Sequence, residues 1–279
     1  MSELFAEVNG IKICYEIHGK GETLILLHGF AMYKEYWIGQ INPLSEHFKV
    51  IIIDNRGCGA SDHPSTPYKI EDMADDVNSL MDYLEIEKAH IGGHSLGGMI
   101  AQRLAIKYPE RLNKLVLLGT FAKLPLDKSG FEMYKNSQLA NYEAKVKDPT
   151  KAFYDKVKQR FTRGFYKKMV ENPKEKFHNL FTTEELMQFE NTKGTSKPQD
   201  IMNLIHSIVN HNTLEHLHKI KNQTLILVGD KDRLAPLISG EAMHERIPNS
   251  ILKTFTGGHW FTLEAAPKVN QTIIDFLKT

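Results

Sequence analysis

Residues 91–98 read Ile-Gly-Gly-His-Ser-Leu-Gly-Gly, and this stretch decides the expected fold. It contains the pattern Gly-x-Ser-x-Gly between a short apolar run at 89–92 and a stretch with helical spacing at 96–108. A serine at such a strand-to-helix turn has a strained backbone, and its hydroxyl stands above the edge of the sheet. The outer glycines are expected because side chains there would collide with the neighbouring strand and helix. The segment therefore predicts one strand–turn–helix unit of an α/β protein.

Strand and helix patterns alternate on both sides of this segment. Alternating or continuous apolar runs predict further strands at residues 11–17, 23–27, 50–53, 115–118, 224–228 and 252–255. Helical spacing predicts helices at residues 70–84 and 268–277, whereas residues 121–217 carry helical spacing throughout and few β-branched runs. The alternation predicts a mostly parallel central sheet flanked by helices, formed by residues 1–120 and 218–279, with residues 121–217 as a helical insertion.

The composition is that of an ordinary globular protein. The chain has 279 residues, 41% hydrophobic and 25% charged, with 35 basic and 34 acidic side chains. A net charge of +1 does not favour a nucleic-acid partner. The two cysteines are too few for a disulfide framework, and no apolar stretch is long enough to span a membrane. The N-terminal residues do not resemble a signal peptide, so we expect a cytoplasmic location.

Ser95 is the candidate nucleophile. At the expected turn, the backbone N–H of Leu96 would face a substrate carbonyl, and the helix N-terminus would add partial positive charge there. A serine before a helix is also a common N-cap, so the motif alone leaves a purely structural role open. The strand before it and the helix after it favour the chemical role.

Residues 28–30, His-Gly-Phe, follow a buried strand and offer a second donor. A glycine in that place allows a sharp turn, so the N–H of Phe30 could complete an oxyanion hole with that of Leu96. The alternative is an ordinary strand-ending turn. We interpret the His28 side chain as structural.

Two loops in the C-terminal part supply the remaining groups. Residues 228–232 contain Asp230 beside the strand and Asp232 deeper in the loop, and we favour Asp232 as the acid that orients a histidine. Among the 13 histidines, His259 follows the serine and the aspartate in the order Ser…Asp…His, and it comes directly after two glycines. It is the candidate base.

No metal or organic cofactor is expected. The histidines between residues 206 and 218 form a loose cluster without the spacing of a common zinc motif. Phe30, Met99 and Trp260 flank the motifs and are candidates for a substrate pocket, although large apolar residues more often belong to the core.

Five motifs together carry a family resemblance: residues 28–30, 54–61, 93–97, 229–232 and 258–260. In this order they resemble the α/β hydrolases of the esterase, enol-lactonase and perhydrolase branch along the whole chain. The resemblance implies that the insertion is a cap, or lid, over the active site and that the acid is Asp232. Dehalogenases and epoxide hydrolases of this fold use an aspartate as nucleophile, whereas this chain has Ser95.

These observations predict a serine hydrolase that cleaves small to medium carboxylic esters or lactones through an acyl-enzyme. Two alternatives stay open: a cofactor-free perhydrolase or hydroxynitrile lyase of the same fold, and a slow ligand receptor that retains the triad. The expected partner is a small-molecule substrate. The natural substrate and the oligomeric state are not predicted by the sequence.

Overall fold

The computed structural model describes residues 3–194 and 196–279, which form an eight-stranded sheet with the order β1-β2-β4-β3-β5-β6-β7-β8. The antiparallel pairs are β1 with β2 and β2 with β4, and all other pairs are parallel. The strands are β1 (Leu4–Val8), β2 (Ile11–His18), β3 (Thr23–Leu27), β4 (Lys49–Ile53), β5 (Ala89–His94), β6 (Leu112–Leu118), β7 (Gln223–Gly229) and β8 (Ser250–Phe255).

The central strands are apolar because both of their faces are covered. Every residue of β3 and β5 is buried, as in parallel sheets with helices on both sides. The outer strand β8 instead alternates exposed and partly buried residues. This difference between centre and edge places the core along the middle strands, where β5 leads directly into Ser95.

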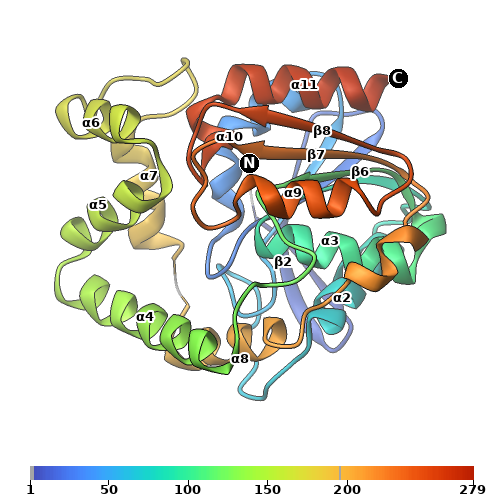
Figure 1. Cartoon of the computed structure of the whole chain (residues 1–279), viewed down its shortest axis with the longest axis horizontal. Helices are drawn as coiled ribbons and strands as arrows, with labels where there is room; N and C mark the ends of the chain where they lie inside the picture. The colour runs from blue at the N-terminus through green and yellow to red at the C-terminus, as the bar shows by residue number, and fades with distance from the viewer. Residues whose placement is uncertain (1–2, 195) are drawn as a thin grey trace.

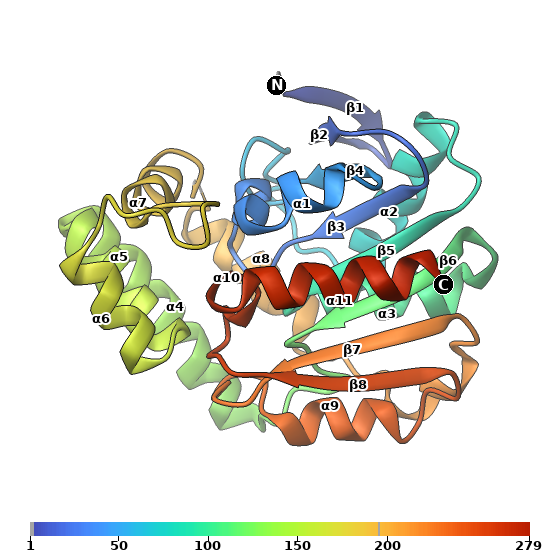
Figure 2. The ribbon, with the colours of Figure 1, turned by 90° about the horizontal axis from the view of Figure 1, so that it is seen from above.

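Helices pack on both faces of the sheet (Figures 1 and 2). One face is covered by α2 (Ile70–Tyr83), α3 (Leu96–Lys107) and α9 (Leu237–His244). The other face is covered by η1 (Lys34–Gly39), α1 (Ile41–Ser45), α10 (Phe261–Glu264) and α11 (Ala266–Lys278). Short turns η2 (Pro109–Arg111) and η3 (Leu214–Lys219) lead into β6 and β7.

Five helices separate β6 from β7 and lie beside one end of the sheet (Figure 2). Side-chain caps start three of them, since Asp127, Asp148 and Thr162 each accept a hydrogen bond from a backbone N–H of the first turn. A capping box of Thr182 and Glu185 starts a fourth. The five are α4 (Lys128–Lys147), α5 (Pro149–Arg160), α6 (Arg163–Glu171), α7 (Thr183–Thr192) and α8 (Pro198–Ile208).

The predicted fold class is confirmed, and each predicted strand has a counterpart in the sheet. Several elements were not predicted: η1, α1, η2, α10, β1 and α9. The β1 strand begins with two exposed apolar residues at the sheet edge, and α9 contains Gly240, which is unusual inside a helix. In the described part of the chain, no helix combines the length and apolar character needed to cross a bilayer. The division into a core and a cap at residues 121 and 217 stays a prediction.

Candidate active site

Ser95 occupies a strained turn between β5 and α3. Its φ of 54° and ψ of −116° lie in a region that side-chain-bearing residues rarely adopt. The turn is possible because Gly93 and Gly97 have no side chain: a Cβ on Gly97 would lie 2.0 Å from the carbonyl oxygen of Leu27, and one on Gly93 would lie 2.2 Å from the carbonyl oxygen of Gly97. The N–H of Ser95 donates to the carbonyl of Leu118 at 2.9 Å, which ties the turn to β6.

His259 and Asp232 form a buried pair at the ends of β8 and β7. The ring Nδ1 of His259 lies 2.8 Å from Oδ2 of Asp232, and the two residues are 6% and 5% exposed. The other carboxylate oxygen, Oδ1, accepts the backbone N–H groups of Leu234 and Ala235 at 2.8 and 2.9 Å. These contacts fix the carboxylate, and they make Nδ1 the protonated ring nitrogen, which leaves Nε2 free to accept a proton.

Asp230, the competing carboxylate, has a different role. Its Oδ1 accepts the N–H of Gly257 at 3.1 Å, and its side chain is 37% exposed beside Lys231. It joins the two loops and does not contact the ring of His259 among the contacts of the described residues.

The loop after β3 places Phe30 next to Ser95. A Cβ on Gly29 would lie 3.4 Å from Cβ of Ser95, so the chain passes close to the serine. Within residues 3–194 and 196–279, the N–H groups of Phe30 and Leu96 donate to no other group. Leu96 is the first residue of α3, where the helix ladder provides no acceptor. Both donors are therefore available to a ligand.

His28 is buried beneath this loop. Its Nε2 accepts the N–H of Asn55 at 3.1 Å, so its Nδ1–H donates to the carbonyl of Gly29 at 2.8 Å. Burial lowers the pKa of the ring, which keeps it neutral. The side chain thus holds the loop, in agreement with its expected structural role.

His94, which the sequence did not single out, fixes the backbone of His259. Its Nε2–H donates to the carbonyl of His259 at 2.9 Å, and its ring stacks on Tyr36 with centroids 4.9 Å apart. Burial, followed by the proximity of His259, holds its pKa well below the ordinary value. The sequence signal was its place directly before Ser95, a position that the motif leaves variable.

A cavity of about 520 Å³ joins these groups to the helical insertion. All the residues expected at the site except Asp232, which lies buried behind His259, contribute to its wall: Phe30, Ser95, Leu96, Met99, His259 and Trp260. The ring of Phe30 meets that of Tyr134 in α4, with centroids 5.6 Å apart. The insertion therefore forms one wall of the cavity and the sheet edge forms the other.

Residues 22–266 match the family model of the α/β hydrolase fold. The chain belongs to the α/β-hydrolase fold family. It is similar to a putative carbamate hydrolase, RutD, of a Caulobacter species, with 29% identity over 94% of both chains. It is 30% identical to 2-hydroxy-6-oxononadienedioate/2-hydroxy-6-oxononatrienedioate hydrolase of Paraburkholderia phymatum, over 96% of this chain and 91% of that protein. The solved esterase EaEST of Exiguobacterium antarcticum superimposes with a TM-score of 0.80 at 27% identity, covering 100% of both chains.

The cavity wall that this α/β hydrolase builds from its insertion is charged. Glu190 of α7 pairs with Lys156 of α5 at 2.8 Å and with Lys145 of α4 at 3.3 Å, and it accepts the hydroxyl of Tyr33 at 3.3 Å. Burial opposes ionisation of the carboxyl, but the two ammonium groups outweigh it and lower its pKa. Glu190 is therefore ionised, and it occupies both lysines.

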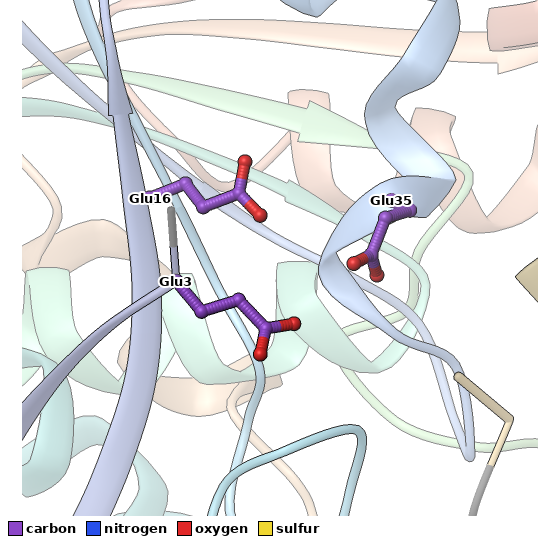
Figure 3. A group of neighbouring side chains, drawn as sticks. All are labelled: Glu3, Glu16 and Glu35. Carbon is purple, nitrogen blue, oxygen red and sulfur yellow. The ribbon is translucent and has the colours of Figure 1, made fainter. Parts of the chain in front are cut away.

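Away from the cavity, Glu3, Glu16 and Glu35 bring their carboxylates within 4.8 Å of one another (Figure 3). Such a group could hold a cation, but Lys34 already supplies one. Its ammonium lies 2.9, 3.6 and 3.0 Å from the three carboxylates. Hydrogen bonds from Lys193 and Lys34 lower the pKa of Glu3 to about 2. The cluster is thus an ion network in which Lys34 balances part of the negative charge.

Proposed function

We propose that this protein is a serine hydrolase that cleaves small to medium carboxylic esters or lactones through an acyl-enzyme. The observation that carries the proposal is the 2.8 Å bond between His259 and Asp232 at the cavity that Ser95 also lines. A base fixed by a buried carboxylate beside a strained serine is the arrangement used for acyl transfer on several folds.

The reaction begins when the Ser95 hydroxyl attacks the substrate carbonyl and Nε2 of His259 takes its proton. Asp232 keeps the proton of His259 on Nδ1 and stabilises the imidazolium that forms. The N–H groups of Phe30 and Leu96 stabilise the oxyanion, and each such donor contributes on the order of 100- to 1000-fold in rate. The imidazolium then protonates the leaving alcohol.

Water completes the cycle. His259 removes a proton from water as it attacks the acyl-enzyme, and the acid product leaves while Ser95 recovers its proton. In a lactone, the leaving alcohol stays attached to the acyl chain throughout, and the product is a hydroxy acid. The reaction uses side chains and backbone N–H groups of this chain together with water.

The helices α4 to α8 act as the cap in this proposal. Helices α4, α5, α7 and α8 contribute a wall of the cavity together with Phe30, Met99 and Trp260, which would contact the acyl group. Trp260 is 4% exposed and meets Phe161 edge-on at 5.5 Å, so the core and the insertion share its ring. The shape of the cap would then limit the acyl length.

A carbamate is a second candidate substrate class, because RutD proteins are among the relatives. The same serine attack on a carbamate carbonyl would release an amine or ammonia, depending on the substituent. The rates of matched ester and carbamate substrates would separate the two classes.

The test compares wild type, Ser95→Ala and Ser239→Ala on 4-nitrophenyl esters of increasing acyl length. Ser239 lies in α9 outside the cavity and serves as the matched control. We expect Ser95→Ala to lose roughly five to six powers of ten in kcat, as removal of the nucleophile does in serine proteases. A fluorophosphonate should label wild type and Ser239→Ala at Ser95. A Ser95→Ala variant that keeps most of its turnover would overturn the proposal.

A further inference from the structure

Arg160 is the last residue of α5 and is fixed next to the loop that carries His259. Its backbone carbonyl accepts the N–H of Trp260 at 3.1 Å. A Cβ on Gly258 would lie 2.3 Å from the same carbonyl, so this glycine allows the helix end to approach. The end of α5 therefore places Arg160 beside the candidate active site.

Arg160 lines the cavity, and its guanidinium has no partner among the described residues. It makes no hydrogen bond there and no ion pair within the 4.0 Å that defines the other pairs. The groups around it that favour its charge are Tyr134, Asp232, Tyr36 and Glu190, in decreasing order of influence. Its charge also acts on Lys156 and His94. Burial lowers its pKa, as expected for a cation removed from water without a bonded acceptor.

The nearby acids are already engaged. The carboxylate of Asp232 binds His259 and two backbone N–H groups, and Glu190 binds Lys145 and Lys156. Asp155 also lines the cavity, but it pairs with Lys151 at 2.6 Å. Five guanidinium donors in a partly buried position are therefore left for a ligand, and burying such a charge without an acceptor is costly.

We propose that Arg160 binds a carboxylate of the substrate, so that the preferred ester or lactone carries a negative charge on its acyl side. This inference rests on the proposed serine hydrolase function. A planar guanidinium pairs with a carboxylate through two parallel hydrogen bonds, which supply orientation as well as affinity. The two ammonium groups of Lys145 and Lys156 and the carboxylate of Glu190 together carry a net charge of +1. The wall around Arg160 therefore also attracts an anion.

The kinetic test uses two esters with the same six-carbon acyl chain, mono-4-nitrophenyl adipate and 4-nitrophenyl hexanoate. We expect wild type to prefer the adipate in kcat/KM. The ratio of the two values should fall roughly 10- to 100-fold in Arg160→Met, as loss of a charged hydrogen-bonded pair implies, and less in Arg160→Lys. Arg163→Met should keep the wild-type ratio, because Arg163 is exposed at the start of α6 and does not line the cavity.

An equal loss on both esters in Arg160→Met would overturn the proposal and assign Arg160 a structural role.

A binding experiment distinguishes an absent anion site from an absent serine mechanism, because binding needs no hydrolysis. Calorimetry would measure adipate, with hexanamide as neutral control, on Ser95→Ala with and without Arg160→Met. We expect adipate to bind Ser95→Ala more tightly than hexanamide, and to weaken roughly 10- to 100-fold when Arg160 is replaced. Equal binding to both proteins, or no preference for adipate, would refute the anion site even if neither ester is hydrolysed.

Discussion

Two buried carboxylates at this cavity, Asp232 at the sheet edge and Glu190 in the insertion, are held in opposite ways. Asp232 is bound by a histidine ring and two backbone N–H groups. Glu190 is bound by the ammonium groups of Lys145 and Lys156. Backbone dipoles and a neutral ring fix Asp232 and leave its charge free to act on His259. The insertion instead gathers formal charges, which suit recognition of a substrate.

The packing also differs between the two regions: it is tight at the serine turn and looser in the helical insertion. At the serine turn, a Cβ on Gly97 would lie 2.0 Å from a neighbouring carbonyl, whereas Gly164 in α6 has nothing within 4 Å of such an atom. Helix α4 contains no buried residue. Reacting groups require a rigid support, while a wall that selects substrates can change its side chains at little cost to the fold.

Among changes to the two carboxylates, the largest effect is expected from Asp232→Asn, which removes the charge and alters the partner of Nδ1. The amide can donate to Nδ1 and stabilise the wrong tautomer of His259, so kcat should fall about 10,000-fold, as in serine proteases. Steady-state kinetics on the best 4-nitrophenyl ester would measure it. Asp230→Asn is the control, since Asp230 accepts the N–H of Gly257 and pairs with the exposed Lys231, and its loss should stay below roughly tenfold. Equal losses in the two variants would mean that Asp232 is not the acid that orients His259.

The sequence predicted the sheet edge better than the insertion, for a physical reason. Parallel strands covered on both faces produce continuous apolar runs, and the ends of β5, β7 and β8 bring Ser95, Asp232 and His259 to one edge. His94 was missed because its partner is a backbone carbonyl 165 residues away.

Arg160 was missed for a related reason. Helical spacing predicts that α5 exists, but the angle at which a helix docks is set by tertiary packing, which leaves no period in the sequence. One signal was present. Gly258, beside the candidate base, is a glycine because the carbonyl of Arg160 lies where its Cβ would be.

The corresponding change from carboxylate to amide in the insertion, Glu190→Gln, should lower the stability of the protein. Glu190→Gln leaves the ammonium groups of Lys145 and Lys156 without their counter-ion. Because these lysine side chains are 23% and 26% exposed, water relieves part of the penalty. We expect a loss of about 2 to 3 kcal/mol in the free energy of unfolding, measured in urea. Glu143→Gln, on the exposed face of α4, should change it by less than about 0.5 kcal/mol. A loss as small as that of the control would mean that the lysines find other partners.

The smallest expected effect is a pH dependence at His211, which follows α8 and is 3% exposed. Burial, followed by the charge of Arg103, lowers its pKa from 6.5 to about 3. Between these values the unfolded chain binds a proton on His211 that the folded chain does not. Stability from this group is therefore complete above pH 6.5 and is lost as pH falls toward 3.

Urea unfolding at about pH 7.5 and about pH 5 would measure this loss, which for one histidine amounts to about 2 kcal/mol. His211→Gln should reduce the difference between the two pH values by that amount. His206→Gln should not, because His206 is exposed on α8. If the two variants keep the same pH dependence as wild type, the acid sensitivity comes from the buried rings at the sheet edge, His28 and His94, whose pKa values burial also lowers. The sheet edge, and not the insertion, would then be the region that acid destabilises.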